Sequence, residues 1–460
     1  MAKVAGCRTM PLLGALPWLV RDPVGVCSRA ALANGGLVRV PLGPTGVYVV
    51  SDPDHVRQVL VTNAANYSKG RIMNGIRIAF GEGLFTSEGA LWRRQRRLMQ
   101  PSFQQSGMRL TSEVVTEVWQ RRLDGWSGPV DLLEEFLHLD IAVILRVLFS
   151  SALPAGRADK LVRLADRVFA GMAGQLPAFF LPRWVPVPGR GAYQRAVREL
   201  DEEIRLLVAM HRDEHGGGEL LQDLLAARDP DTGEPMSDRQ IRDEIFTMFM
   251  AGYESTASTL AWTCHLLNEA PEVTHTLRAE VDRALAGRTP TINDLPELPY
   301  TARVIAEGLR LYPAFPMYFR AADGADRLGD HPIPAGAQLV LCPHATHRTP
   351  EHWPDPERFD PDRFEPGSVA IRHRAAYFPF GLGQRRCIGE PMALTIATLA
   401  LVMLVQRFDL TPGTAPVTGR YAMTYQPRHG LVVTPAARES GDSSGRVADF
   451  VRPDRIPDSP

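Results

Sequence analysis

The chain has 460 residues, and its 51 lysines and arginines nearly balance its 52 aspartates and glutamates, which gives a formal net charge of −1. Such a chain presents no strong field of one sign to attract nucleic acid or an anionic membrane surface. With 45% hydrophobic and 22% charged residues, the composition is that of a globular protein and excludes a disordered or collagen-like chain.

The apolar segments and the cysteines indicate a soluble protein. No segment approaches the roughly 18 consecutive apolar residues of a membrane span, and prolines and a glycine interrupt the apolar run 10–20. That run also lacks the basic lead and the cleavage site of a secretory signal. The five cysteines are scattered, without a C-x-x-C pair and in an odd number for a disulfide framework. We therefore expect a cytoplasmic protein without a membrane span.

The first elements in the chain are strands, and helices follow. Two β-branched runs, 35–42 and 46–50, flank the turn residues Gly43 and Pro44 and predict a hairpin. From Asp52 onward most of the chain has helical periodicity, interrupted by prolines. The pattern predicts a mainly α protein with a smaller β part.

Strand patterns return in the last third of the chain. We expect them at 338–341, at 422–425 and at 431–433. No repeat or linker divides the chain, so residues 1–435 are predicted to form a single domain. Residues 436–460 have few apolar anchors and are predicted to form a disordered tail.

The longest predicted helix covers residues 237–270. Ser237 and Gln240 have the spacing of a capping box, and Pro271 follows the last helical residue. The segment 245–252 is apolar on nearly every face and must be buried, yet polar residues follow at once. Buried polar groups require hydrogen-bond partners or a function.

A single cysteine stands in an unusual segment, F-P-F-G-L-G-Q-R-R-C-I-G-E-P, residues 378–391. Its glycines permit a tight turn before Cys387, and apolar spacing with Pro391 in the first turn predicts a helix directly afterwards. A thiol at a helix N-terminus is favoured as the thiolate, the form of cysteine that binds a metal. The alternative is an inert, buried cysteine beside a glycine turn.

This segment resembles the haem-binding loop of the cytochrome P-450 family, F-x-x-G-x-R-x-C-x-G, at every fixed position. The resemblance implies that Cys387 is the thiolate ligand of the iron in haem b. It also implies that Arg385 pairs with a haem propionate and that Phe380 packs beside the thiolate. Gly381 and Gly389 belong to the same cofactor-binding loop.

A charge network of the family has matching residues. Glu307 and Arg310 lie three apart on a predicted helix that ends at Pro313, so their side chains share one face. The later motif D-P-E-R-F, residues 355–359, supplies Arg358 as the expected third member of a buried network. Without that context, Glu307 and Arg310 would be interpreted as a solvated surface pair.

Two further motifs resemble the family's propionate-binding residues. Trp92 and Arg96 match its W-x-x-x-R helix, and Arg320 matches a later propionate partner. The alternatives for the first motif are an exposed basic helix or an arm that contacts RNA. The remaining arginines of this segment are expected to form a basic patch that attracts an acidic electron donor: Arg93, Arg94 and Arg97, together with Arg386.

The polar run in the long helix, A-G-Y-E-S-T, resembles the family's A-G-x-[D/E]-T segment. There Gly252 would open space for dioxygen, and Glu254 with the hydroxyl of Ser255 would relay protons. The usual threonine is replaced by Ser255, so Thr256 is a second candidate for the relay hydroxyl. The alternatives are a structural carboxylate at Glu254 and a Ser255 hydroxyl bonded to its own helix.

The resemblance covers about residues 10 to 435 and implies a triangular, mostly α fold with a β-rich N-terminal corner. It implies a monooxygenase that inserts one atom of O₂ into its substrate. No flavin or ferredoxin domain is expected in the chain, so a ferredoxin or flavodoxin-type donor with an NAD(P)H-dependent reductase would supply electrons to a monomer. Haem proteins that bind gas or transfer electrons, and O₂-independent haem-thiolate isomerases or dehydratases, are alternatives that the Glu254 segment disfavours.

The expected substrate is bulky and apolar. Similarity to bacterial relatives favours a terpenoid, while fatty acids, steroids and polyketides remain alternatives. The segment 177–186 would cap the entrance of the pocket or form an ordinary apolar surface loop. The residues expected to line the pocket are mostly apolar: Phe249, Met250, Phe315, Met317, Tyr318, Thr424 and Tyr425.

Overall fold

The computed structural model describes residues 4–43, 45–70, 73–103, 105–149, 156–175, 189–212, 219–421 and 423–438. The helices are α1 (Leu16–Arg21), α2 (Pro23–Leu32), α3 (Pro53–Arg57), α4 (Met73–Phe80), α5 (Gly89–Met99), α6 (Gln105–Leu123), α7 (Leu132–Phe149), α8 (Arg157–Gln175), α9 (Arg190–Arg212), α10 (Glu219–Ala226), α11 (Asp238–Glu269), α12 (Pro271–Leu285), α13 (Pro299–Leu311), α14 (Pro343–Thr346), α15 (Pro366–Ile371) and α16 (Glu390–Arg407). The strands are β1 (Leu37–Leu42), β2 (Thr45–Val50), β3 (Tyr67–Ser68), β4 (Val130–Asp131), β5 (Tyr318–Ala322), β6 (Asp326–Leu328), β7 (His331–Ile333), β8 (Gln338–Leu341), β9 (Phe408–Pro412), β10 (Gly419–Tyr421), β11 (Tyr425–Pro427) and β12 (Val432–Ala437). The mainly α class is confirmed.

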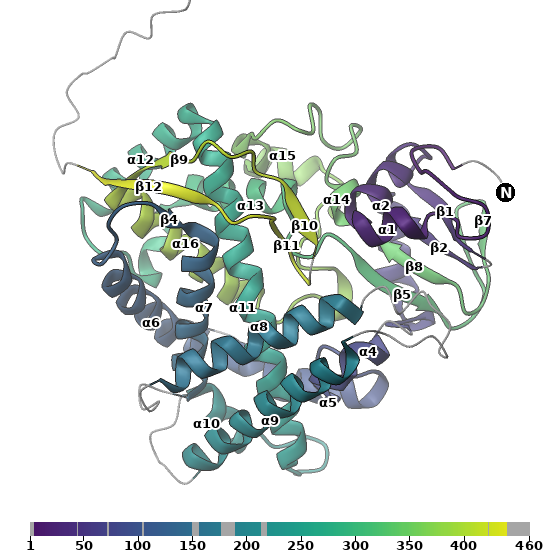
Figure 1. The fold of residues 1–460 in the computed structure, drawn as a ribbon, viewed down its shortest axis with the longest axis horizontal. Coiled ribbons are helices and arrows are strands. Elements are labelled where there is room, and N and C mark those ends of the chain that lie inside the picture. Colours follow the sequence, from purple (N-terminus) through teal and green to yellow (C-terminus); the bar gives the residue numbers. More distant parts are fainter. Residues whose placement is uncertain are drawn as a thin grey trace, which may run out of the picture.

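A five-stranded sheet forms a β-rich corner at one side of the helical body (Figure 1). Its order is β1-β2-β8-β5-β3, in which only β2 and β8 are parallel. The predicted hairpin is confirmed, since β1 and β2 pair antiparallel from Leu37 opposite Val50. Helices α1 and α2 lie beside this sheet, and Val24, Val40 and Val49 belong to their shared core.

The helix α11 runs through the centre of the helical body (Figure 1). The predicted capping box is present: Gln240 N donates to Ser237 Oγ over 3.2 Å, and Ser237 N donates to Gln240 Oε1 over 3.3 Å. α11 packs against α7, α13 and α16. Because the helix is enclosed by these neighbours, apolar residues occupy most of its circumference.

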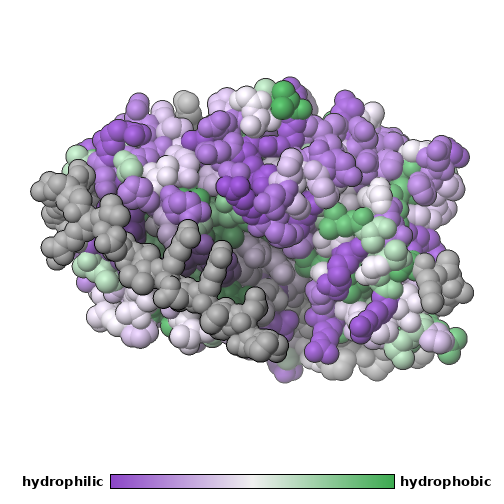
Figure 2. Space-filling model, turned by 90° about the horizontal axis from the view of Figure 1, so that it is seen from above, coloured by the Kyte–Doolittle hydropathy of each residue, from purple (hydrophilic) through white to green (hydrophobic). Residues whose placement is uncertain are grey.

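The C-terminal helix α16 is long and apolar enough to cross a membrane, by length and composition only. Of its residues 61% are buried inside the protein, and Leu399 and Leu401 are fully buried. It packs against α6 and α13, so α16 is a core helix of this fold. Hydrophilic side chains make up most of the coloured part of the face in Figure 2, where hydrophobic residues form only small patches.

The last strands correct two expectations. Within segment 422–425, the described residues Met423 and Thr424 are not extended but form a bend between β10 and β11, and only Tyr425 belongs to a strand. The boundary of the predicted tail is also wrong, because Ala436 and Ala437 pair with Asp409 and Phe408 of β9. The rest of the predicted tail, 439–460, and the predicted capping segment lie outside the described residues.

Candidate functional site

A cavity lies between α11, the cysteine loop, α5, α7 and the turn between β10 and β11. The volume that the centres of water molecules can occupy in this cavity is about 330 Å³. Most of the residues predicted for the site line it: Trp92, Arg96, Gly252, Ser255, Thr256, Arg320, Phe380, Arg385, Cys387 and Gly389. Segments far apart in the sequence therefore meet at one site.

The cysteine loop owes its shape to glycines. Gly381 and Gly383 have φ of +75° and +68°, values that residues with a Cβ adopt only with strain. A Cβ on Gly383 would also lie 2.3 Å from the carbonyl oxygen of Leu60. The tight turn brings the amide of Cys387 to the carbonyl oxygen of Phe380, at 2.9 Å. Gly381 shapes this loop without lining the cavity.

The thiol of Cys387 faces the cavity just before α16, whose first turn contains Pro391 as predicted. Cys387 is exposed toward the cavity, and desolvation by the surrounding loop raises the pKa of its thiol. The backbone amides of Gly389 and Glu390 and the charge of Arg96 lower the pKa but do not reverse the shift. The expected thiolate is therefore not favoured by the helix end alone, and a bound metal ion would have to stabilise it.

Cations gather on one wall of the cavity. Arg96, Arg320 and Arg385 lie there beside Lys69, a residue that the sequence analysis missed and whose pKa is lowered well below its ordinary value by burial and by the charge of Arg385. Burial and the charge of Arg385 lower the pKa of Arg320 to about 10. Within the described part of the chain, the carboxylate of Glu88 pairs with one of these cations, Arg385. The excess of positive charge fits a ligand with two carboxylates, such as the propionates of haem.

Lys69 is held in place by carbonyl oxygens. Its Nζ donates to those of Leu84, Phe85 and Ser87 over 3.2, 2.6 and 3.1 Å. Its side chain thereby fixes the segment that precedes α5. The motif Y-S-K-G gave only a weak signal, although lysine is rare in this chain.

Helix α5 brings its predicted pair to the cavity. Trp92 and Arg96 lie four residues apart and both line it. The guanidinium of Arg385 lies 4.6 Å from the ring centre of Trp92, and Arg96 donates to the carbonyl oxygen of Arg386 over 2.9 Å. α5 and the cysteine loop are thus directly joined.

The expected basic patch is largely neutralised. Arg94 pairs with Asp229 over 2.6 Å, and Arg97 pairs with Asp231 over 2.7 Å. Arg386 pairs with Glu390. Arg93 is exposed, and the structure gives it no ion pair among the described residues.

The glycine of α11 faces a neighbouring helix. A Cβ on Gly252 would lie 2.7 Å from Cδ1 of Ile144 on α7. Gly252 therefore permits the close packing of α7 and α11, besides lining the cavity. Ser255 also lines the cavity, but its hydroxyl donates to the carbonyl oxygen of Ala251 over 2.9 Å, as the alternative interpretation expected. Thr256 lies on the cavity wall and is 5% exposed.

Glu254 points away from the cavity. Its Oε2 accepts a hydrogen bond from Thr424 over 3.0 Å, and its side chain is buried. Burial raises the pKa of Glu254 to about 7, although hydrogen bonds from Thr424 and Gln426 lower it. A carboxyl with this pKa can both accept and release a proton near neutral pH.

The substrate-pocket predictions are partly wrong. Phe249 and Met250 are buried against other elements, and Met248 and Ala251 line the cavity instead. Thr424 and Tyr425 do not line it either, and Tyr421 and Met423 take their place. The remaining candidates, Phe315, Met317 and Tyr318, line the cavity, and their contact with substrate stays a prediction.

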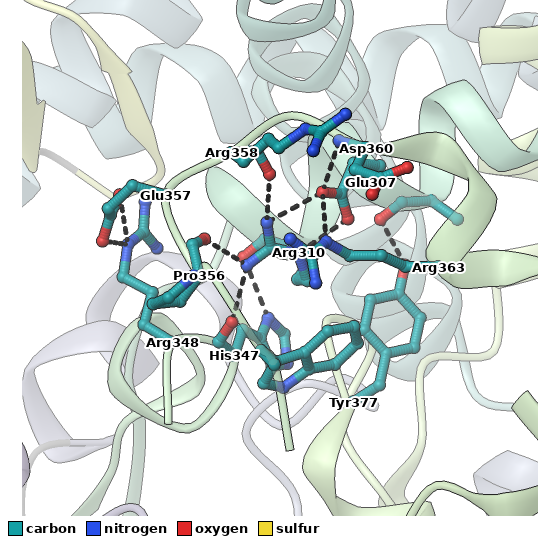
Figure 3. Close-up of polar contacts among 12 residues, drawn as sticks. Glu307, Arg310, His347, Arg348, Pro356, Glu357, Arg358, Asp360, Arg363 and Tyr377 are labelled. Atoms are coloured by element: carbon teal, nitrogen blue, oxygen red, sulfur yellow. Dashed lines mark hydrogen bonds and ion pairs between the residues drawn. The ribbon is translucent and has the colours of Figure 1, made fainter. Parts of the chain in front are cut away.

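Glu307 and Arg310 form the centre of the charge network, and both side chains are fully buried (Figure 3). Arg310 donates two hydrogen bonds to Glu307, over 2.6 and 2.8 Å. It also donates to the carbonyl oxygens of His347 and Pro356, over 2.9 and 2.7 Å. Burial raises the pKa of Glu307, and the charge of Arg310 opposes that shift.

The prediction that Arg358 is the third member of the network is wrong. Arg358 is exposed and contributes only its carbonyl oxygen, which accepts from Arg310 over 3.1 Å. Arg363 occupies the expected position, with its Nε 3.4 Å from Glu307 Oε1 and its side chain 10% exposed (Figure 3). The sequence contains D-P-E-R-F and then D-P-D-R-F, and the second copy supplies the buried arginine.

Comparison with known proteins agrees with this geometry. The family model "Cytochrome P450" matches residues 4–432. Cyclooctatin synthase of Streptomyces melanosporofaciens is 34% identical, over 88% of this chain and 89% of its own. Pentalenene oxygenase of Streptomyces avermitilis is 34% identical, over 87% and 90%. Among solved structures, the cytochrome P450DA heme domain superposes with a TM-score of 0.85 at 28% identity, covering 96% of this chain and 99% of that one.

Proposed function

Because this chain belongs to the cytochrome P-450 family and is a haem-thiolate monooxygenase with haem b as its cofactor, we propose that it oxidises a bulky, apolar terpenoid. The observation that carries this proposal is the wall of the cavity, which is mostly apolar away from the cations. Side chains from four separate segments contribute to it, among them Met73, Val143, Phe315 and Met423. Two relatives named for cyclooctatin and pentalenene support the same substrate class.

We propose that Cys387 is the thiolate ligand of the iron. When bound, haem supplies the chemistry that activates dioxygen. The guanidinium groups of Arg96, Arg320 and Arg385 would neutralise its propionates, and Trp92 would pack beside them. Lys69, whose three N–H groups donate to carbonyl oxygens, would hold the segment before α5 in place. The phenyl ring of Phe380 would shield the sulfur, and the backbone amides of Gly389 and Glu390 would moderate its basicity.

Protons would reach the oxygen site from α11. Glu254, with a pKa of about 7, is suited to pass protons, and Ser255 places a hydroxyl on the cavity wall. To act as a relay, the Ser255 hydroxyl would have to leave the carbonyl oxygen of Ala251. Thr256 remains the second candidate for that step.

Like other members of the family, the enzyme needs a redox partner and O₂ and binds an organic substrate. We propose that a ferredoxin or flavodoxin-type protein, reduced by an NAD(P)H-dependent reductase, delivers electrons. Arg93 is the exposed cation beside the cysteine loop that would contact it. We place the enzyme in the cytoplasm, because NAD(P)H and such carriers are available there. We also propose that it is a monomer.

Titration of the ferric holoenzyme tests the substrate class. A cyclic terpene hydrocarbon is expected to shift the iron to the high-spin form, as it displaces water from the pocket. Tight binding of only charged or sugar-bearing ligands would overturn the proposal, and a preference for a fatty acid, a steroid or a polyketide would replace the terpenoid. Turnover under ¹⁸O₂ separates a monooxygenase from an isomerase, because only the former labels its product.

A further inference from the structure

The acid of α11 is anchored to the C-terminal hairpin formed by β10 and β11. Thr424 lies in the turn of this hairpin, and its hydroxyl contacts Glu254 at 3.0 Å. Thr424 is 2% exposed and Glu254 7%. This contact joins residues 170 positions apart in the chain, and both side chains are almost entirely buried.

The hydroxyl of Thr424 lies at the centre of a closed set of hydrogen bonds. It accepts from Gln426 Nε2 over 3.1 Å and lies 3.2 Å from the hydroxyl of Ser258, one turn after Glu254 on α11. A hydroxyl both donates and accepts. Thr424 can therefore donate to the ionised carboxylate while Ser258 donates to it, or accept from the protonated acid while it donates to Ser258.

The same turn forms part of the cavity wall. Tyr421 and Met423 line the cavity on either side of residue 422, and Thr424 follows directly. The strand after the turn is fixed to the body of the protein, because Trp262 donates to the carbonyl oxygen of Tyr425 over 2.8 Å and Tyr425 N donates to Ala314 O over 2.9 Å. Consequently the contact surface for substrate and the holder of the acid belong to one short, anchored segment.

The charges that face Glu254 come from several elements. Arg420 on β10 lowers the pKa of Glu254, whereas Asp166 on α8 raises it. Asp166 accepts a hydrogen bond from Tyr253, the residue before Glu254. Since burial is the largest cause of the raised pKa and Thr424 is the first group that opposes it, loss of the Thr424 hydroxyl should raise the pKa further.

We propose that Thr424 is the positioning residue for Glu254. Its hydroxyl holds the carboxyl out of the cavity, sets its proton affinity, and connects it to the turn that contacts the substrate. This inference rests on the proposed proton-delivery role of Glu254. The Thr424 contact itself can be measured in the resting enzyme, so its failure is distinguishable from a failure of the proposed function.

The test is an infrared titration of the resting holoenzyme between pH 5 and pH 9. The C=O band of protonated Glu254 is assigned by its loss in Glu254→Gln. Thr424→Val should raise the midpoint of this band by roughly 0.5 to 1 pH unit and move its frequency, because the carboxyl loses a hydrogen bond. Thr424→Ser should restore the wild-type midpoint. The matched control is Thr418→Val, an exposed threonine on the same hairpin, which should leave both unchanged.

A wild-type midpoint and frequency in folded Thr424→Val would overturn the proposal, as would an equal shift in Thr418→Val. Should Thr424→Val lose the native haem spectrum, Ser258→Ala provides the second test. It removes the hydroxyl that faces Thr424 without touching Glu254, and a smaller upward shift is expected. An unchanged midpoint in Ser258→Ala would then contradict the hydrogen-bonded set.

Discussion

The carboxyl of Glu254 and the hydroxyl of Ser255, adjacent in the sequence, point to different partners: Glu254 to Thr424 on the C-terminal hairpin, and Ser255 to the carbonyl oxygen of Ala251 on its own helix. In the resting protein the acid and the alcohol are therefore not hydrogen-bonded through their side chains. The proposed delivery of protons to the cavity by these two residues requires that at least one of these contacts be exchanged.

Ser255→Ala is expected to divert oxygen to hydrogen peroxide, because a hydroxyl on the cavity wall, adjacent to the acid in the sequence, is lost. Ser255→Thr should reduce peroxide release, since a β-branched side chain samples fewer rotamers. Glu254→Gln should slow product formation by about 10²-fold, as an amide cannot cycle a proton. Product and peroxide per NAD(P)H consumed are the measurements. A silent Ser255→Ala with strong uncoupling in Thr256→Ala would assign the relay to Thr256.

Removal of the buried arginine beside Glu307 should destabilise the protein. Arg363→Ala leaves part of the charge of Glu307 without its partner and is expected to cost about 1–3 kcal/mol. Arg358→Ala is the matched control, because that exposed side chain is not part of the network, and its effect should remain within about 0.5 kcal/mol. Urea unfolding midpoints measure both. A larger effect at Arg358 would restore the assignment made from the sequence.

The two arginines show where sequence reasoning reaches its limit. The helix around Glu307 and Arg310 could be predicted from spacing, and so could the capping box of Ser237 on α11. Both signals are local. The choice between Arg358 and Arg363 depends on how the chain between two similar motifs folds back onto α13, which the spacing does not specify.

The prediction of the cavity-lining residues was partly wrong for a related reason. Because α11 is apolar on nearly every face, the pattern did not reveal that Met248, and not Phe249, faces the cavity. Likewise the sequence did not reveal the role of Lys69, because the carbonyl oxygens to which its side chain donates come from another segment. The cysteine loop was predictable in detail, because its glycines, arginine and cysteine are contiguous.

Asp140 on α7 should make stability depend on pH. It is 2% exposed, no cation pairs with it among the described residues, and burial raises its pKa well above the ordinary value, although a backbone hydrogen bond from Ala257 opposes that shift. The folded protein thus keeps a proton that the unfolded chain releases above about pH 4, so this residue destabilises the fold increasingly as the pH rises. Asp140→Leu is expected to gain about 1–3 kcal/mol at pH 7 and little at pH 4.

Urea unfolding at both pH values measures this difference, and the exposed Asp330→Leu serves as the control. A gain that is the same at pH 4 and pH 7 would show that Asp140 is not protonated in the fold.

Arg93→Glu should slow reduction by a ferredoxin, and more so at low ionic strength, where charges are less screened. Arg97→Glu should slow reduction by a ferredoxin less than Arg93→Glu does, since Arg97 already pairs with Asp231. The control is Arg327→Glu in the β-rich corner, an exposed residue away from the cysteine loop. Stopped-flow reduction of the haem gives the rates. Equal, salt-independent rates for Arg93→Glu and wild type would contradict docking at α5.

The most direct test of the site is the absorption spectrum of the reduced protein under carbon monoxide. Thiolate ligation by Cys387 predicts a red-shifted Soret band for the wild type and its loss in Cys387→Ser, in which only one ligand atom changes while Cys27, Cys264 and Cys342 remain buried elsewhere. A Cys387→Ser protein that binds haem and keeps the thiolate-type band would contradict the assignment.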